Sequence, residues 1–386
     1  MKTYKNLYPD LASFGNLYVA FMGAARGTLA PALRSGASAG ERGNPEVAAF
    51  EFDLEANLFQ LESELCEYTY RPKPYYSFRI RDPKSRLISA ARFRDRVVHH
   101  ALVQFVEPIF ERGFIYDSYA NRRGKGTHRA LDRCQSFARG YRYVLQCDLR
   151  QFFPSVDHAI LREILARKIA DPGVTWLAGC ILESGAGVLD DEYDMVYFPA
   201  DYPLTGLGVS DRPNGSGQGL FAVNRPRGLP IGNLTSQFWA NCYLNPLDHF
   251  IKRELHCRAY LRYVDDFVLF SDCKRQLWEC KRAIHDFLAR LRLSLHERES
   301  TVYPVTNGIP FLGFRVYPTH RRLKRRNGVA FARRLRAGCA ALARGEITQQ
   351  ELNQRVRGWV AHAAHGDTYR LRQSLFSSMR IPRSKG

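Results

Sequence analysis

The sequence lacks the features that mark membrane-bound and secreted proteins. It contains no run of apolar residues near the ~20 needed to span a bilayer, and its mean hydropathy is −0.34. Residues 1–21, MKTYKNLYPDLASFGNLYVAF, have neither the apolar core nor the cleavage site of a signal peptide. We therefore expect a cytoplasmic protein that makes no contact with a membrane.

The sequence contains cysteines but lacks the closely spaced cysteine pairs of metal sites and disulfide frameworks. The nine cysteines are an odd number, and no two of them form a C-x-x-C pair. This spacing indicates neither a zinc site nor a disulfide framework. We expect reduced cysteines packed in the core.

Acidic residues are scarce relative to basic ones. The chain has 57 Lys and Arg against 38 Asp and Glu, a formal charge of +19 and a pI near 9.7. From Arg315 to the end, seventeen basic residues face three acids, Glu346, Glu351 and Asp367. Such runs can be solvated faces, but this density favours a polyanionic partner, and nothing in the sequence is typical of a basic membrane anchor.

The apolar pattern predicts helices and strands interspersed without a repeat, which indicates an α+β fold of two or three subdomains within 386 residues. Residues 184–226 are rich in Gly, Pro and Asp and are predicted to be a surface insertion. The expected helices cover 50–70, 92–114, 157–169, 232–255, 273–291 and the basic C-terminal part, and the expected extended segments cover 75–91, 143–148, 260–270 and 308–318.

Two adjacent carboxylates, Asp265 and Asp266, interrupt the apolar stretch YLRYVDDFVLF at 260–270. Apolar and β-branched residues on both sides predict a hairpin with the charged pair at its turn. A solvated hairpin tip is one interpretation, and a metal site is the other.

The metal interpretation gains support from Asp148, which ends the predicted strand at 143–148. If that strand neighbours the hairpin in one sheet, three carboxylates converge. Mg²⁺ takes oxygen ligands and is usually held by one or two carboxylates together with substrate phosphates. Two such ions can clamp the attacking and leaving oxygens of a phosphoryl transfer. A basic protein with this site is a candidate nucleotidyl transferase.

Six segments follow one another along the chain: RFRDRVVHHAL, SYANRRGKGTHRAL, QCDLRQFFPSVDH, GLPIGNLTSQFWANCYLNPLD, LRYVDDFVLF and GIPFLGF. Together they resemble the motifs of reverse transcriptases, in that family's order, over roughly residues 50 to 320. IGNLTSQ more narrowly resembles the signature of reverse transcriptases from diversity-generating retroelements. The resemblance implies a right-hand polymerase fold: an N-terminal extension at 1–45, fingers and palm with an antiparallel sheet at 46–317, and a basic helical thumb at 318–386.

The resemblance also implies roles for single residues. Asp148, Asp265 and Asp266 would be catalytic and would hold two Mg²⁺ ions, with Mn²⁺ as the alternative. Phe153 would be the aromatic gate against a ribose 2′-hydroxyl, and Ile231 stands where relatives carry glutamine. The expected nucleotide-binding set is Lys84, Arg86, Phe153, Ile231, Gly232 and Gln237. The expected nucleic-acid contacts are Arg122, Arg123, Lys125, Arg321, Arg322, Lys324, Arg325 and Arg326. A solvated surface is the alternative for the basic residues, and a core aromatic for Phe153.

Some positions receive no catalytic role. Glu299 stands where the family often has a lysine, and the neighbouring Arg298 is a poor acid, so the general acid stays unassigned. Four histidines, His99, His100, His362 and His365, lack partners at ligand spacing and are expected to be core or phosphate-facing.

The resemblance implies an RNA-directed DNA polymerase that makes error-prone, adenine-mutagenic cDNA in a diversity-generating retroelement. Its partners would be a template RNA with a primer or cDNA, deoxynucleoside triphosphates and a small basic accessory protein. A reverse transcriptase of another prokaryotic class, from phage defence or of the intron type, is the nearest alternative. A non-catalytic RNA-binding protein on the same fold is a second.

Overall fold

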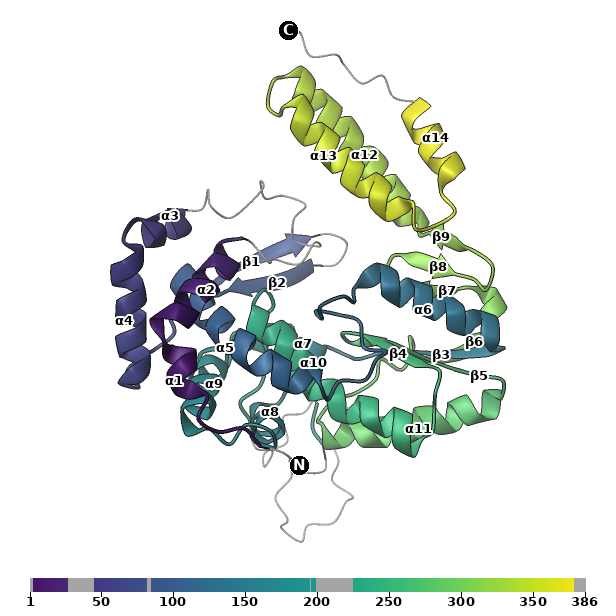
Figure 1. The fold of residues 1–386 in the computed structure, drawn as a ribbon. Helices are drawn as coiled ribbons and strands as arrows, with labels where there is room; N and C mark the ends of the chain where they lie inside the picture. Colours follow the sequence, from purple (N-terminus) through teal and green to yellow (C-terminus); the bar gives the residue numbers. More distant parts are fainter. Residues whose placement is uncertain (1–2, 27–44, 82–84, 195, 199–224, 378–386) are drawn as a thin grey trace. The chain divides into compact units, whose positions relative to one another are not determined.

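The computed structural model describes residues 3–26, 45–81, 85–194, 196–198 and 225–377. The chain folds into two compact units, each assembled from three segments (Figure 1). The first unit comprises Met1–Tyr116, Leu149–Phe250 and Ala283–Leu295, and the second comprises Asp117–Asp148, Ile251–Arg282 and His296–Gly386. Neither unit is a continuous stretch of sequence, and the linear domain boundaries expected above stay a prediction.

The first unit is mainly helical, with one antiparallel hairpin, β1–β2. The long buried helix expected at 92–114 is confirmed as α5. The elements are α1 (Tyr8–Ala12), α2 (Phe14–Ala25), α3 (Pro45–Phe52), α4 (Leu54–Cys66), β1 (Tyr76–Arg81), β2 (Ser85–Ala90), α5 (Phe93–Glu111), α7 (Phe152–Ser155), α8 (His158–Ala166), α9 (Pro172–Ser184), a 3₁₀ turn (Asp190–Glu192) and α10 (Leu234–His249).

Helix α5 is the central element of the first unit, because α2 and α10 both pack against it. Apolar residues recur along it at helical spacing, and Val97, Ala101 and Leu102 are among those that are buried. At Gly23 of α2, a Cβ would come within 2.9 Å of His100 Nδ1. A residue without a side chain is therefore needed where α2 meets α5.

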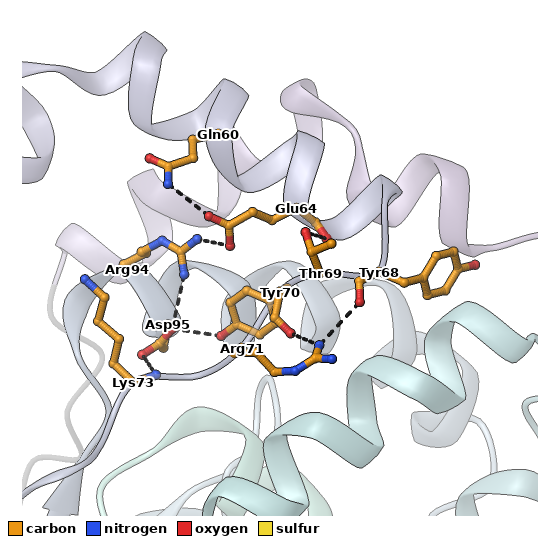
Figure 2. A network of polar contacts seen from close by, with 9 residues as sticks. All are labelled: Gln60, Glu64, Tyr68, Thr69, Tyr70, Arg71, Lys73, Arg94 and Asp95. Carbon is orange, nitrogen blue, oxygen red and sulfur yellow. Dashed lines mark hydrogen bonds and ion pairs between the residues drawn. The ribbon is translucent and has the colours of Figure 1, made fainter.

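A buried carboxylate, Asp95, ties the start of α5 to the segment after α4 (Figure 2). It accepts hydrogen bonds from the Tyr70 hydroxyl and from the Lys73 backbone N–H, both at 2.9 Å. Arg94 lies 3.8 Å from it and also pairs with Glu64. Burial raises the pKa of Asp95 while these donors oppose the rise. Asp95 therefore has a structural role, because it accepts hydrogen bonds from the segment after α4 and lies beside the Arg94 cation.

The second unit contains the antiparallel sheets expected from the sequence. A four-stranded sheet has the order β4-β5-β3-β6, and a three-stranded sheet has the order β7-β8-β9. The elements are α6 (Thr127–Gly140), β3 (Tyr143–Asp148), β4 (Tyr260–Tyr263), β5 (Asp266–Ser271), β6 (Thr301–Pro304), β7 (Ile309–Phe311), β8 (Phe314–Val316), β9 (Arg321–Leu323), α12 (Arg325–Ala343), α13 (Gln349–Ala363) and α14 (Tyr369–Ser377). A π-helical turn covers Phe250–Glu254, and α11 (Lys274–Arg290) contributes to both units.

Helix α6 packs on strands of both sheets and closes one apolar core with them. Leu131 of α6, Val144 of β3, Val268 of β5 and Phe314 of β8 belong to that core. Helices α12 and α13 have a small core of their own, in which the rings of Phe331 and Trp359 stack at 3.8 Å. The mixture of helices and antiparallel sheets confirms the predicted α+β class.

Three details of the sequence-based interpretation need correction or fall outside the described residues. Residues 321–323 were expected in a helix but form β9, and helix begins only at Arg325. All nine cysteines are free as expected, but Cys66 and Cys273 are exposed, not in the core. The predicted insertion at 184–226 and the extension at 1–45 are described only in part, and Lys84 lies outside the described residues. No described helix has the length and apolarity that crossing a membrane requires.

Candidate active site

Two carboxylates face each other across the central strands of the second unit. Strand β3 ends at Asp148, as predicted, and β5 begins at Asp266. The antiparallel register places these two residues directly opposite each other. Asp265 lies in the turn just before β5, so the hairpin expected at 260–270 is confirmed.

The pKa of Asp266 is raised to about 7. The largest cause is burial, followed by the charges of Asp265 and Asp148 and a side-chain hydrogen bond with Asp148. Neighbouring carboxylates repel each other when both are ionised, and a cation bound between them would offset that repulsion. Carboxylate oxygens are also the ligands that Mg²⁺ takes. The donor set therefore fits a hard divalent ion.

The full ligand set stays a prediction. Among the described residues, no group of three or more His, Cys, Asp or Glu side chains is arranged to hold a metal ion. The structure brings Asp148 and Asp266 together, and it places Asp265 close enough for its charge to act on Asp266.

The charge of Lys324 acts on Asp266, although the sequence placed Lys324 among the nucleic-acid contacts. Its charge lowers the pKa of Asp266. Burial and the charge of Arg326 lower the pKa of Lys324, and Asp266 and Glu299 oppose that change. Glu299 is itself exposed and lies 4.0 Å from His296 Nε2. Lys324 is thus a cation of the carboxylate site that its position in a basic run did not reveal.

The predicted nucleotide motif of the first unit forms a tightly held turn before α10. Gly232 has φ +119°, and a Cβ there would come within 3.0 Å of Ile88 Cγ2. The buried Asn233 side chain accepts from Ala91 N–H at 2.9 Å and donates to Ser89 O at 2.8 Å. Sequence reasoning passed over Asn233, although asparagine beside glycine at a turn was a usable signal.

Ile231 and Gln237 flank that turn and are both half-buried. The Ile231 carbonyl accepts a hydrogen bond from Ser89 N–H at 2.8 Å. A cavity of about 10 Å³, which is room for one water molecule, is lined by Gly232, Gln237 and His99. His99 is buried, so its expected place in the core is confirmed, and burial lowers its pKa to about 3.

The other predicted nucleotide contacts of the first unit are accessible. Arg86 is exposed on β2, opposite Ile80 of β1. Phe153 is half-buried in the short helix α7, beside the buried Phe152 at a ring distance of 5.3 Å. Their roles stay predictions.

The basic loop before α6 has mixed exposure. Arg123 is exposed, whereas Arg122 donates to Ser118 O at 2.8 Å and Lys125 lies 5.1 Å from the Tyr119 ring centroid. The contact of this loop with nucleic acid stays a prediction.

The basic run at 321–326 divides into two parts. Arg321 forms an ion pair with Asp132 at 2.6 Å, and only 10% of its side chain is exposed. Arg322, Arg325 and Arg326 are exposed. The last two begin α12, where the helix dipole is positive and further cations are unfavourable unless an anion binds.

Comparisons with known proteins agree with this arrangement. Residues 73–316 match the family model described as reverse transcriptase (RNA-dependent DNA polymerase). Protein YkfC of Escherichia coli is 26% identical over 306 residues, covering 68% of this chain and 72% of that protein. The group II intron-encoded protein LtrA of Lactococcus lactis is 24% identical, and the alignment covers 51% of this chain but 28% of LtrA.

Two further matches are an intron protein and a solved structure. The COX1/OXI3 intron 1 protein of Saccharomyces cerevisiae is 25% identical, with 67% of this chain and 34% of that protein covered. Apo telomerase from Candida tropicalis superposes with a TM-score of 0.47 at 11% identity, covering 66% of this chain and 49% of that one. The family model covers more than half of the chain and brings with it the right-hand polymerase fold. The chain therefore belongs to the reverse transcriptase family and is an RNA-directed DNA polymerase.

Proposed function

We propose that the enzyme joins nucleotides by two-metal catalysis, with Asp148, Asp265 and Asp266 as the metal ligands. The observation that carries the proposal is the direct opposition of Asp148 and Asp266 on β3 and β5, with Asp265 adjacent. When bound, two Mg²⁺ ions would stabilise the attacking and leaving oxygens of the transfer. The charge of Lys324, which lowers the pKa of Asp266, would also favour the ionised form of that carboxylate.

The residues of the first unit would select the nucleotide. The Gly232 turn offers a backbone position that has no side chain of its own, and Phe153 offers an aromatic ring against the sugar. Arg86 would pair with the triphosphate, and the exposed Arg325 and Arg326 with template or primer phosphates.

Within the family, we propose the mutagenic enzyme of a diversity-generating retroelement, acting with a structured template RNA and a small basic accessory protein. The supporting feature is the IGNLTSQ segment, in which Ile231 replaces an amide that could hold the incoming nucleotide. An intron-type reverse transcriptase is the second candidate, favoured by the likeness to LtrA and to the COX1/OXI3 intron 1 protein of Saccharomyces cerevisiae.

Sequencing of the cDNA separates the two candidates. The purified chain copies a defined RNA with Mg²⁺, with and without a candidate small basic accessory protein, and the errors are counted for each template base. Errors concentrated opposite adenine support the retroelement enzyme. Faithful synthesis at all four bases in both conditions supports the intron type.

A further inference from the structure

The turn that carries the catalytic aspartates has an unusual backbone. Val264, just before Asp265, has φ +55°. Left-handed backbone is rare for residues other than glycine and is a genuine outlier for a β-branched side chain. Of the non-glycine residues with positive φ in the described chain, Val264 is the one with such a side chain. Something in the fold must hold this conformation.

The buried arginine two residues earlier supplies a direct restraint. Arg262 is 0% exposed, although it carries a charge and lies in an otherwise apolar strand. One of its guanidinium nitrogens donates to the Val264 carbonyl oxygen at 3.0 Å. A hydrogen bond from an ionised donor is stronger than a neutral one. Because Arg262 is fully buried, it cannot contact a phosphate in this conformation.

The backbone of Arg262 is fixed as well. Its N–H donates to Asp117 O at 2.9 Å, and its carbonyl accepts from Tyr119 N–H at 3.0 Å. The Asp117 carboxylate is in turn held by Arg133 at 2.8 Å and by Lys252 at 3.1 Å. The backbone from which the guanidinium extends is therefore held on both sides. The next residue, Tyr263, pairs with Asp266 across the hairpin.

We propose that Arg262 is the positioning residue of the catalytic turn. By holding the Val264 carbonyl, it maintains the left-handed backbone that presents Asp265 and keeps Asp266 opposite Asp148. The inference rests on the proposed metal-binding role of these aspartates. A positioning role differs from a purely structural one in a testable way. The loss of metal binding on replacing Arg262 should depend on which residue occupies position 264.

A double-mutant cycle tests that dependence. Arg262→Met removes the donors at similar length, and Val264→Gly allows the left-handed turn without assistance. The readout is Mn²⁺ binding to the protein without nucleic acid, measured by electron paramagnetic resonance. Arg262→Met should weaken binding by about 10–100-fold in the parent, the range for residues that orient metal ligands. In the Val264→Gly background, the same change should cost several-fold less.

Arg225→Met is the matched control, because Arg225 is also buried and pairs with Asp157 at 3.1 Å in the first unit. It should lower the melting temperature but leave Mn²⁺ binding unchanged. If Arg262→Met does not fold, Arg262→Lys takes its place in the cycle, since lysine keeps a donor but not the reach of the guanidinium.

Two results would overturn the proposal. Equal losses in both backgrounds, or a lower melting temperature with parental Mn²⁺ affinity, would leave Arg262 a structural residue only. Asp265→Asn, measured alongside, tests the proposed metal site on which this inference rests. If it binds Mn²⁺ like the parent, the metal site itself is overturned, and the positioning role falls with it.

Discussion

Gly232 and Val264 both have positive φ, and both lie in turns that carry sequence motifs, yet the two turns are held differently. At the Gly232 turn, the glycine itself allows the positive φ, because it has no Cβ that would strain the backbone or collide with Ile88. At the Val264 turn, another residue stabilises the positive φ, because the buried Arg262 guanidinium donates a hydrogen bond to the Val264 carbonyl.

The two turns also differ in the charge of the groups around them. Neutral groups hold the Gly232 turn, namely the Asn233 amide, backbone N–H groups and the Ser236 hydroxyl, which donates to Pro230 O at 2.7 Å. Charged groups surround the Val264 turn, including Asp266 and Lys324. Substitutions in the first turn should therefore change stability and nucleotide selection, whereas substitutions of charge in the second unit should change catalysis and the response to salt.

The largest effect is expected from Asp265→Asn, which removes a carboxylate from the charged turn. RNA-templated primer extension should fall on the order of 10²–10³-fold, the scale at which electrostatic transition-state stabilisation is lost. RNA affinity should stay near the parent value, because no phosphate contact is removed. Asp286→Asn, at an exposed side chain of α11, is the control and should extend primers normally. Retained synthesis in Asp265→Asn would remove the catalytic assignment.

Gly232→Ala tests the neutral turn. The new Cβ meets Ile88 at 3.0 Å on a backbone that L-residues rarely adopt, so the free energy of unfolding should fall by about 1–3 kcal/mol. The apparent KM for deoxynucleotides should rise. Gly15→Ala in α2 is the matched control, because a Cβ there meets nothing within 4 Å. Chemical denaturation that gives equal stability for both variants would show that the turn relaxes without cost.

Much of the Val264 turn could be predicted from the sequence, whereas Gly232 was expected in a helix that begins only at Leu234. Alternating apolar residues that end at charged ones located β3 up to Asp148 and the hairpin around Asp265. The strand β9 could not be predicted, because Arg321 and Arg322 are extended only through pairing with β8. The burial of Arg262 was equally hidden, since it depends on hydrogen bonds to a loop more than a hundred residues earlier.

A smaller effect is expected where α12 begins. Replacing both Arg325 and Arg326 by glutamine should reduce the slope of log affinity against log salt by about 0.7–0.9 for each lost phosphate contact. Arg321→Gln should change the slope little, because that side chain is already paired with Asp132. Filter binding of RNA over a range of salt concentrations measures both. A slope unchanged by the double substitution would identify these arginines as a solvated face.

The smallest effect is expected from Ile231→Gln, beside the neutral turn. The Ile231 carbonyl is held by Ser89 N–H, so the substitution alters the side chain without releasing the backbone. Isoleucine offers no hydrogen bond, whereas an amide could bond to the incoming nucleotide. A neutral hydrogen bond is worth about 0.5–1.5 kcal/mol, and about 1.4 kcal/mol is a tenfold change, so selectivity should improve several-fold to tenfold.

If the enzyme has the adenine-directed infidelity proposed above, the gain in Ile231→Gln should be larger at template adenines than at the other bases. Sequencing of cDNA made from one RNA by the parent and the variant measures this difference. Ile231→Val is the control, because it keeps an apolar β-branched side chain and should leave the error spectrum as it is. An identical spectrum in all three enzymes would place the source of infidelity outside this turn, with Gln237 in the first turn of α10 as the first residue to test.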